Sequence, residues 1–337
     1  MLTGIFAGIT WALETVILGL ALTMSPFVST EQAVLLAPFI ATFLHDAVSA
    51  SCMLIYNALR GGLKGFFGVC RSRTALWLTL SSAVGGPIGM TGYVLAVSCL
   101  GPSVGAVASA VYPAVGTVLA RIFLKEKTKW YQWIFLILTL AGVYGLSYTP
   151  SFSAENFWLG LLGAFMCAFG WGTEAVILAK CLKDTTVKDE YALGIRQAVS
   201  ALLYGLLILP LLGGWRMTAE LFVGGEGKLL LTVAVAALCA TVSYLLYYRT
   251  IGKLGASKAM ALNITYTAWA IVFTVALTGD LGVLSPMTLL CSAVIVLCGV
   301  LSAADLRALF GRQGSVGESE KTCKKMQKKV KNFSKTY

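Results

Sequence analysis

The chain has 337 residues, of which 58% are hydrophobic and 12% are charged. An ordinary soluble domain has ~45–50% apolar and ~25% charged residues, so this composition excludes a soluble globular enzyme and a disordered chain. The net charge of +11 does not indicate nucleic-acid binding. The basic residues lie in short loops and in a lysine-rich tail, as in bilayer proteins. We therefore expect a lipid bilayer, and no nucleic acid, as the partner.

Apolar segments follow one another along the whole chain, and each is about as long as a membrane-spanning helix. The first carries Glu14 and lacks a basic leading region, so we interpret it as a retained helix and not as a signal peptide. The sequence predicts an all-α integral membrane protein with ten transmembrane helices, at residues 3–22, 32–58, 75–98, 103–124, 130–149, 156–180, 190–212, 229–250, 256–279 and 285–304.

The loops between these segments differ sharply in positive charge. On one side of the membrane lie Arg60, Lys64, Arg71, Arg73, Arg121, Lys125, Lys127, Lys129, Lys180, Lys183, Lys188, Arg249, Lys253 and Lys258. The other side has only Arg216 and Lys228. Positive loops stay in the cytoplasm, so we expect a multi-pass plasma-membrane protein with both termini cytoplasmic.

The nine cysteines form no C-x-x-C pair and no zinc-like spacing with the single histidine. Most lie inside apolar segments, where a free cysteine acts as a small packing residue. We therefore expect no metal and no cofactor.

Three segments recur in the same order in the second half of the chain. Trp11-Ala-Leu-Glu14 recurs as Trp171-Gly-Thr-Glu174, His45-Asp46-Ala-Val-Ser-Ala50 as Arg196-Gln197-Ala-Val-Ser-Ala201, and Leu100-Gly-Pro-Ser103 with Tyr112 as Leu254-Gly-Ala-Ser257 with Tyr266. These matches predict a first five-helix repeat at 1–149, a second at 150–304 and a basic cytoplasmic tail at 305–337. An odd number of helices inverts the second repeat, which is a recurrent design of transporters.

Charged residues inside the apolar segments are the strongest functional signal. Glu14, Asp46, Glu174 and Arg196, with His45 beside them, lie well inside predicted helices. A charge at the centre of a membrane helix costs roughly 2.5–3.5 kcal/mol, so such residues usually face a cavity or a partner. The excess of carboxylates favours a cationic substrate or protons.

Two interpretations remain open for part of this group. Asp46 and Arg196 are candidates either for a transport role or for a structural ion pair between helices. His45 is either a proton relay or a hydrogen-bonded structural histidine, and Gln197 adjoins Arg196 at the position that matches Asp46.

Aromatic residues accompany the two glutamates. Trp11 and Glu14 share a helix face at i,i+3, as do Trp171 and Glu174. Indole and phenol faces bind quaternary ammonium ions, each contact contributing ~0.5–2 kcal/mol. Further candidate substrate-binding residues are Tyr112, Asn263, Tyr266 and Trp269. By contrast, we expect most of the tyrosines at 244, 247 and 248 to belong to an interfacial belt.

The third predicted helix contains Gly85-Gly-Pro-Ile-Gly-Met-Thr-Gly92. Glycine and proline interrupt the hydrogen bonds of a helix, and the backbone groups left without a partner must bond to other parts of the protein or to water in a cavity. We expect either a kink that bends during opening or close helix packing at this segment.

Several motifs together resemble the drug/metabolite transporter superfamily of EamA type, and more closely the LicB-type choline permeases. They are Phe123-Leu-Lys-Glu126, His45-Asp46, Gly86-Pro-Ile-Gly-Met90, Ser109-Ala-Val-Tyr-Pro113, Trp171-Gly-Thr-Glu174, Ile195-Arg-Gln197 and Leu262-Asn-Ile-Thr-Tyr266 with Trp269. The resemblance implies a secondary transporter that moves choline or a related quaternary amine inward by alternating access. Glu14 and the tail beyond Asp305 have no match in it.

Two other functions are to be compared with transport of a quaternary amine. A superfamily exporter of amino acids, metabolites or cationic drugs would use the same scaffold. An intramembrane enzyme is suggested only by Gly101-Pro-Ser-Val-Gly105, whose nucleophile pattern needs a strand–turn–helix elbow that a helical membrane protein lacks. The seven lysines between Lys321 and Lys335 are expected either to bind anionic lipids or to form a disordered solubilising tail.

Overall fold

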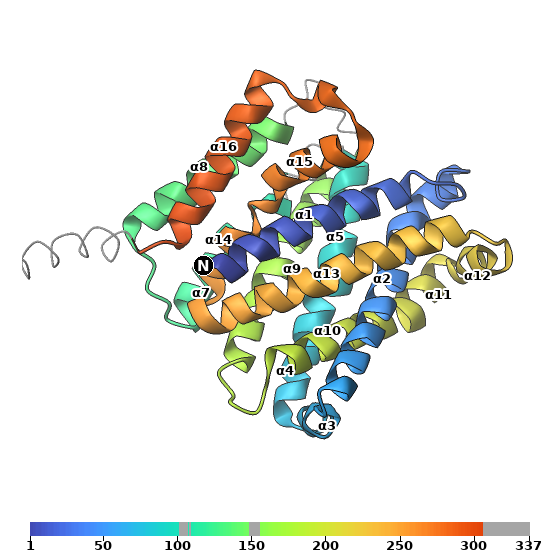
Figure 1. Ribbon diagram of the computed structural model, residues 1–337, viewed down its shortest axis with the longest axis horizontal. Helices are drawn as coiled ribbons and strands as arrows, with labels where there is room; N and C mark the ends of the chain where they lie inside the picture. The colour runs from blue at the N-terminus through green and yellow to red at the C-terminus, as the bar shows by residue number, and fades with distance from the viewer. Residues whose placement is uncertain (101–106, 108, 148–155, 306–337) are drawn as a thin grey trace, which may run out of the picture. The chain divides into compact units, whose positions relative to one another are not determined.

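The computed structural model describes residues 1–100, 107, 109–147 and 156–305. The chain divides into two compact units, Met1–Ala303 and Ala304–Tyr337. The first unit consists of helices (Figure 1): α1 (Leu2–Leu22), α2 (Glu31–Leu59), α3 (Leu63–Cys70), α4 (Arg73–Ala83), α5 (Gly89–Leu100), α7 (Tyr112–Phe123), α8 (Trp130–Ser147), α9 (Phe157–Cys181), α10 (Asp189–Leu203), α11 (Leu209–Leu212), α12 (Trp215–Val223), α13 (Gly227–Leu254), α14 (Ala256–Asn263), α15 (Tyr266–Thr278) and α16 (Pro286–Ala303). Two π-helical turns, η1 (Val84–Ile88) and η2 (Tyr204–Ile208), and one 3-10 turn, η3 (Leu281–Val283), complete it.

The predicted membrane fold is confirmed. Within the described ranges, nine helical segments are long and apolar enough to cross a membrane, and α7 is a shorter apolar helix. These ten elements correspond to the ten predicted ones. The structure also contains the short helices α3 and α12 between spans, which the hydropathy pattern did not predict. In α3, only Phe66 and Val69 are buried.

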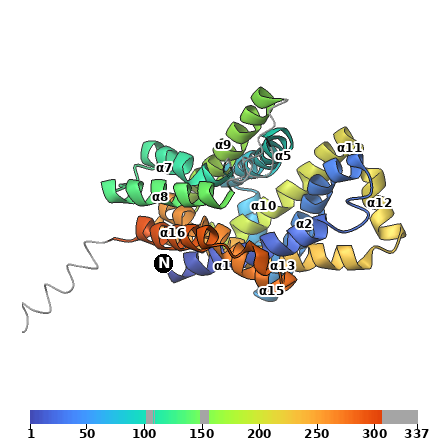
Figure 2. The ribbon, with the colours of Figure 1, turned by 90° about the horizontal axis from the view of Figure 1, so that it is seen from above.

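The contacts between the spans come in matched pairs. α1 packs against α13 and α15, while α9 packs against α5 and α7. In the same way, α2 packs against α13 and α4 packs against α10. Each contact has an equivalent in which every span of the first five is replaced by the corresponding span of the second five. The contact α1/α13 thus corresponds to α9/α5, α1/α15 to α9/α7, and α2/α13 to α10/α4. The self-related pairs α8/α16 and α2/α10 lie on different sides of the bundle (Figure 2). The two five-helix repeats stay a prediction, and their predicted boundary at 149/150 lies outside the described residues.

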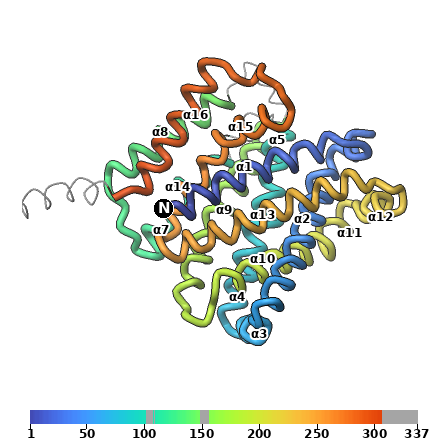
Figure 3. The backbone as a smooth tube through the Cα atoms, in the orientation of Figure 1, coloured from blue at the N-terminus to red at the C-terminus, as the bar shows by residue number. Residues whose placement is uncertain are grey.

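The spans run back and forth between two ends of the bundle, as the tube view in Figure 3 shows. We call the end with residues 60–72, 124–129, 182–188 and 255 the basic end, because the loops rich in lysine and arginine lie there. Asn57 contacts the Glu190 carbonyl and Thr250 contacts Thr3 at this end. The opposite end consists of residues 23–30, 213–226 and 279–285.

The third span changes its helical pitch where the sequence predicted a kink or close packing. Residues Val84–Ile88 form a π-turn that includes Pro87, which lacks the amide hydrogen of a regular helix. Close packing is also present, because a Cβ added at Gly92 would lie 2.6 Å from the carbonyl oxygen of Gly163. The π-turn and the glycines bring α5 and α9 together beside the candidate site.

Candidate functional site

A cavity of about 640 Å³ lies within the first unit. It is lined in part by Glu31, Val34 and Leu35, which are exposed at the start of α2. The cavity therefore reaches the surface at the opposite end of the bundle. At its deep side it is lined by residues of both repeats: Trp11, Glu14, His45, Asp46, Trp171, Arg196, Tyr244 and Tyr266.

A smaller chamber of about 60 Å³ lies next to this cavity. Its lining residues are Trp11, Tyr112, Trp171, Glu174, Ala175, Leu178, Tyr244, Tyr247, Tyr248, Asn263 and Tyr266. Four rings line both spaces, namely those of Trp11, Trp171, Tyr244 and Tyr266. We call these four residues the aromatic layer, since they separate the chamber from the cavity.

The rings of the aromatic layer are held in contact with one another and with neighbouring rings. The Trp11 ring centroid lies 4.6 Å from that of Tyr244 and 6.3 Å from that of Tyr266. The ring centroid of Trp171 lies 5.9 Å from that of Tyr112 and 6.1 Å from that of Tyr93. The arrangement offers several π faces to a ligand at the deep side of the cavity.

The charged residues predicted from the sequence form one continuous chain across the bundle. Glu14 Oε1 lies 3.7 Å from His45 Nε2, and His45 Nδ1 lies 2.9 Å from Asp46 Oδ1. Arg196 Nη1 donates to Asp46 Oδ2 at 3.4 Å, and its Nε donates to Glu174 Oε1 at 3.0 Å. Each of the five side chains belongs to a residue less than a tenth exposed.

Within this row of charged side chains, the two glutamates have corresponding positions but different basic partners. Glu14 faces His45 on the next span, and Glu174 faces Arg196, the residue that matches His45 in the second repeat. Arginine keeps its proton at any physiological pH, whereas histidine titrates near neutrality. Glu174 therefore pairs with a permanent cation, whereas the base that faces Glu14 is a titratable ring. Both interpretations of Asp46 remain, because it lines the cavity and also pairs with Arg196.

Arg196 is held by further neighbours. Its Nη1 donates to the Oε1 atom of Gln197 at 2.8 Å, and its guanidinium carbon lies 4.8 Å from the Tyr244 ring centroid. Glu174 is also enclosed closely: a Cβ added at Gly85 would meet its carboxylate oxygen, and Trp171 Nε1 donates to the Gly85 carbonyl at 2.9 Å. These contacts fix Arg196 and Glu174 in place.

The remaining predicted site residues divide into two groups. Tyr112 and Asn263 meet in the chamber, where Asn263 Nδ2 donates to Tyr112 Oη at 3.1 Å. Within the described part of the chain, the Oδ1 atom of Asn263 has no hydrogen-bond partner. Trp269 lines neither of the two spaces described here, although the other predicted cage residues do.

The interfacial-belt interpretation of the α13 tyrosines is wrong. Tyr247 and Tyr248 are 8% and 1% exposed and belong to the core, and Tyr244 is part of the aromatic layer. Their 244/247/248 spacing puts them on one helix face, which was the available signal. Tyr93 was also missed, because it follows the glycine-rich segment and no charged residue marks its helix face.

Two segments that carried sequence interpretations lie outside the described ranges. The first is Gly101–Gly105, which suggested a serine nucleophile. The second is the lysine-rich tail, which suggested anionic lipids as a partner.

Comparison with known proteins gives a match to one family and to two relatives. Residues 1–148 match the EamA-like transporter family. Protein LicB of Haemophilus influenzae is 30% identical over 194 residues, which are 57% of this chain and 63% of LicB. Riboflavin transporter ImpX of Fusobacterium nucleatum is 25% identical over 198 residues, 58% of this chain and 63% of that protein. The chain thus spans less than two thirds of the length of both relatives.

A solved crystal structure shares the fold. It superposes with a TM-score of 0.66 at 17% sequence identity, covering 90% of this chain and 96% of the other.

Proposed function

We propose that the protein is a secondary transporter of choline or a related quaternary-amine cation, and the match of residues 1–148 to the EamA-like transporter family supports this. The substrate binds against the aromatic layer and crosses the plasma membrane by alternating access. The basic loops and both termini face the cytoplasm, and the direction of transport is uptake.

The observation that carries this proposal is the combination of π faces with an acid that lacks a permanent partner. The aromatic layer and Glu14 line the same cavity. Within the described part of the chain, the basic group closest to Glu14 is the titratable ring of His45, at 3.7 Å. Aromatic cages with a counter-charge are the usual way in which proteins bind quaternary ammonium groups.

Hydrogen-bonding capacity favours a quaternary over a primary amine. A primary ammonium group has three N–H donors and needs several oxygen acceptors around it. Here the oxygens of Asp46 and Glu174 already accept from Arg196. A trimethylammonium group has no N–H donor, and it needs only rings and a negative charge.

The two spaces outline a route through the bundle for the proposed uptake. The large cavity reaches the surface at the opposite end, and the small chamber lies on the other side of the aromatic layer. A cation that passes the layer would enter a chamber walled by Tyr112, Tyr247 and Tyr248. With the basic end in the cytoplasm, this route leads inward.

Proton coupling is part of the proposal. His45 contacts both Glu14 and Asp46, so its proton and the substrate cation compete for the same carboxylates. Binding of the cation then favours release of the proton, and the reverse. Uptake that ignores an imposed pH gradient would contradict this part alone.

A second candidate is transport of an uncharged aromatic molecule, favoured by the match to a riboflavin transporter. The stacked pair Tyr93 and Trp171, with an interplanar angle of 27°, offers a surface for a flat ring. An export function on the same scaffold is the further alternative. Transport of an uncharged molecule gives Glu14 no role as counter-charge, whereas an exporter of cationic drugs would use Glu14 in the same way as a choline transporter.

Thermal stability of the purified protein with candidate ligands separates these candidates, since a ligand that binds the folded state raises the Tm. The panel contains choline, betaine, tetramethylammonium, a primary amine, an amino acid, a lipophilic cation and riboflavin. We expect choline and tetramethylammonium to raise the Tm, and counterflow of labelled choline in vesicles to demonstrate transport. Stabilisation by riboflavin alone would reject the quaternary-amine proposal.

A further inference from the structure

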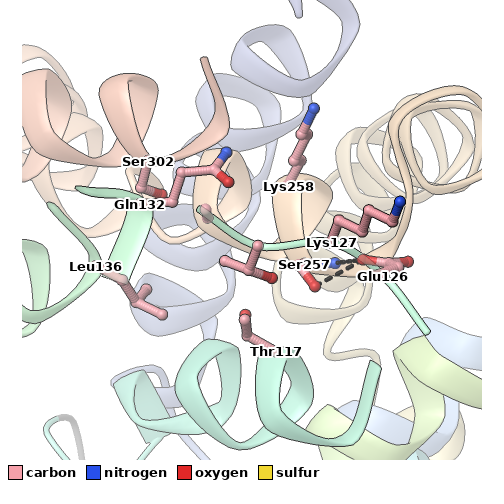
Figure 4. Close-up of a pocket in the computed structure, with 10 residues that line it drawn as sticks. Thr117, Glu126, Lys127, Gln132, Leu136, Ser257, Lys258 and Ser302 are labelled. Atoms are coloured by element: carbon pink, nitrogen blue, oxygen red, sulfur yellow. Dashed lines mark hydrogen bonds between the residues drawn. The ribbon is translucent and has the colours of Figure 1, made fainter. Parts of the chain in front are cut away.

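Glu126 joins the two repeats at the basic end of the bundle. Glu126 lies in the loop between α7 and α8, and its carboxylate reaches the first turn of α14 (Figure 4). Oε1 accepts from the Ala256 amide at 2.9 Å, and Oε2 accepts from the Ser257 amide at 3.1 Å and from Ser257 Oγ at 2.6 Å. A carboxylate that accepts from a helix N-terminus makes strong, charge-assisted hydrogen bonds.

The backbone on both sides is shaped for this contact. Lys125, directly before Glu126, has φ 56°, a left-handed conformation that is uncommon for residues other than glycine. Gly255, directly before α14, has φ 88°. A Cβ added at Gly255 would lie 2.7 Å from Glu126 Oε1. The strained residue and the close approach indicate that the contact is held under constraint and is lost when the two segments separate.

The contact lies beside the inner chamber. Glu126 follows α7, which carries Tyr112, and the helix that it contacts, α14, ends at Asn263. Tyr112 and Asn263 hydrogen-bond to each other across the chamber. The chamber cannot open toward the basic end between α7 and α14 unless these helices move apart, which breaks the bonds of Glu126.

The corresponding acid of the second repeat behaves differently. Asp280 lies in the loop between α15 and α16, at the opposite end of the bundle. Its Oδ1 accepts from the Gly282 amide at 2.8 Å, within its own loop. The closed end therefore has its loop acid bonded to the other repeat, and the open end has its loop acid bonded locally.

From this contrast we infer that Glu126 and the N-terminus of α14 form a gate at the basic end, closed in this conformation and released when the chamber opens to the cytoplasm. The inference rests on the proposed alternating-access function. Glu126 acts through the position of α14 and not through contact with the substrate.

Hydrogen–deuterium exchange of Glu126→Gln tests the gate without any substrate. The matched control is Glu220→Gln, an exposed acid paired with Arg216 in α12 at the opposite end. We expect Glu126→Gln to raise exchange in residues 256–263 on the order of tenfold. We also expect it to lower exchange in residues 31–38, which line the outer cavity, because opening one end closes the other. The control should change neither segment.

Faster exchange at 256–263 without the reciprocal change at 31–38 would show that Glu126 only caps α14, and it would overturn the inference. If Glu126→Gln fails to fold, the double variant Glu126→Cys with Ser257→Cys carries the test, joined by a short cleavable bis-thiol reagent, with each single cysteine variant as control. The cross-linked protein should exchange at 31–38 like the parent, and cleavage of the reagent, which leaves the variant without the carboxylate, should lower exchange at 31–38. No change at 31–38 on cleavage would overturn the inference. Failure of choline to bind or be transported would reject the proposed substrate and leave the exchange result unaffected.

Discussion

Replacing each glutamate of the charged chain by glutamine should have opposite consequences for binding and stability. Glu14→Gln removes the acid that lacks a permanent partner, and Glu174→Gln removes the acid that Arg196 neutralises. Both changes conserve shape and delete one negative charge. They therefore test whether the His45/Arg196 difference between the repeats separates a binding acid from a structural one.

The magnitudes follow from the surroundings of each carboxylate. A cation held ~5 Å from Glu14 gains about 3 kcal/mol at an effective dielectric constant of ~20, so Glu14→Gln should weaken choline binding roughly 100-fold. Glu174 lies 3.0 Å from Arg196, and both are buried. Removing one partner of a buried ion pair costs about 3–5 kcal/mol, so Glu174→Gln should lower the Tm markedly.

The assay is a choline titration followed by thermal unfolding, for the parent and both variants. The expected pattern is a near-parental Tm with weak binding for Glu14→Gln, and a low Tm for Glu174→Gln. Equal loss of affinity and equal loss of stability in the two variants would refute the separation of roles. Choline binding by Glu14→Gln at parental affinity would remove the counter-charge from the proposal.

Further predictions concern the rings, the glycines and the basic-end loops. Trp11→Ala should weaken choline binding by about 0.5–2 kcal/mol of lost cation–π energy, as measured by ligand-dependent Tm, whereas an unchanged affinity would place the cation elsewhere. Gly85→Ala should destabilise the protein in thermal unfolding because the new Cβ overlaps the Glu174 carboxylate, while Gly68→Ala, with open space around it, should be neutral. Hydrogen bonds from Thr186 and Thr74 lower the pKa of Asp184, so the charged form stabilises the fold at neutral pH and this contribution is lost as pH falls through the folded pKa. Asp184→Asn should therefore lower the Tm at pH 7 and match the parent in acid; a constant difference would contradict the assignment.

Apolar length predicted the spans, and the cost of buried charge predicted that Glu14, Asp46, Glu174 and Arg196 face a cavity or a partner. The ion pair between Asp46 and Arg196, one of the two interpretations of these residues, is present in the structure. The second bond of Arg196, to Glu174, depends on helix rotation, which hydropathy does not encode, so it was not foreseen. Tyr244 was missed because a tyrosine in an apolar helix has the same pattern whether it faces lipid or a cavity. Trp269 was included because the i+3 stripe through Tyr266 continues past the point where α15 leaves the cavity.

Two inverted halves with identical sequences would make the inward-facing and outward-facing forms equal in energy, because a two-fold axis would exchange them. Here one half has an arginine where the other has a histidine, so the titratable base of the charged group lies in one half alone. Under the proposed proton coupling, the balance between the two forms shifts with acidity, and a pH difference across the membrane sets the sense of travel.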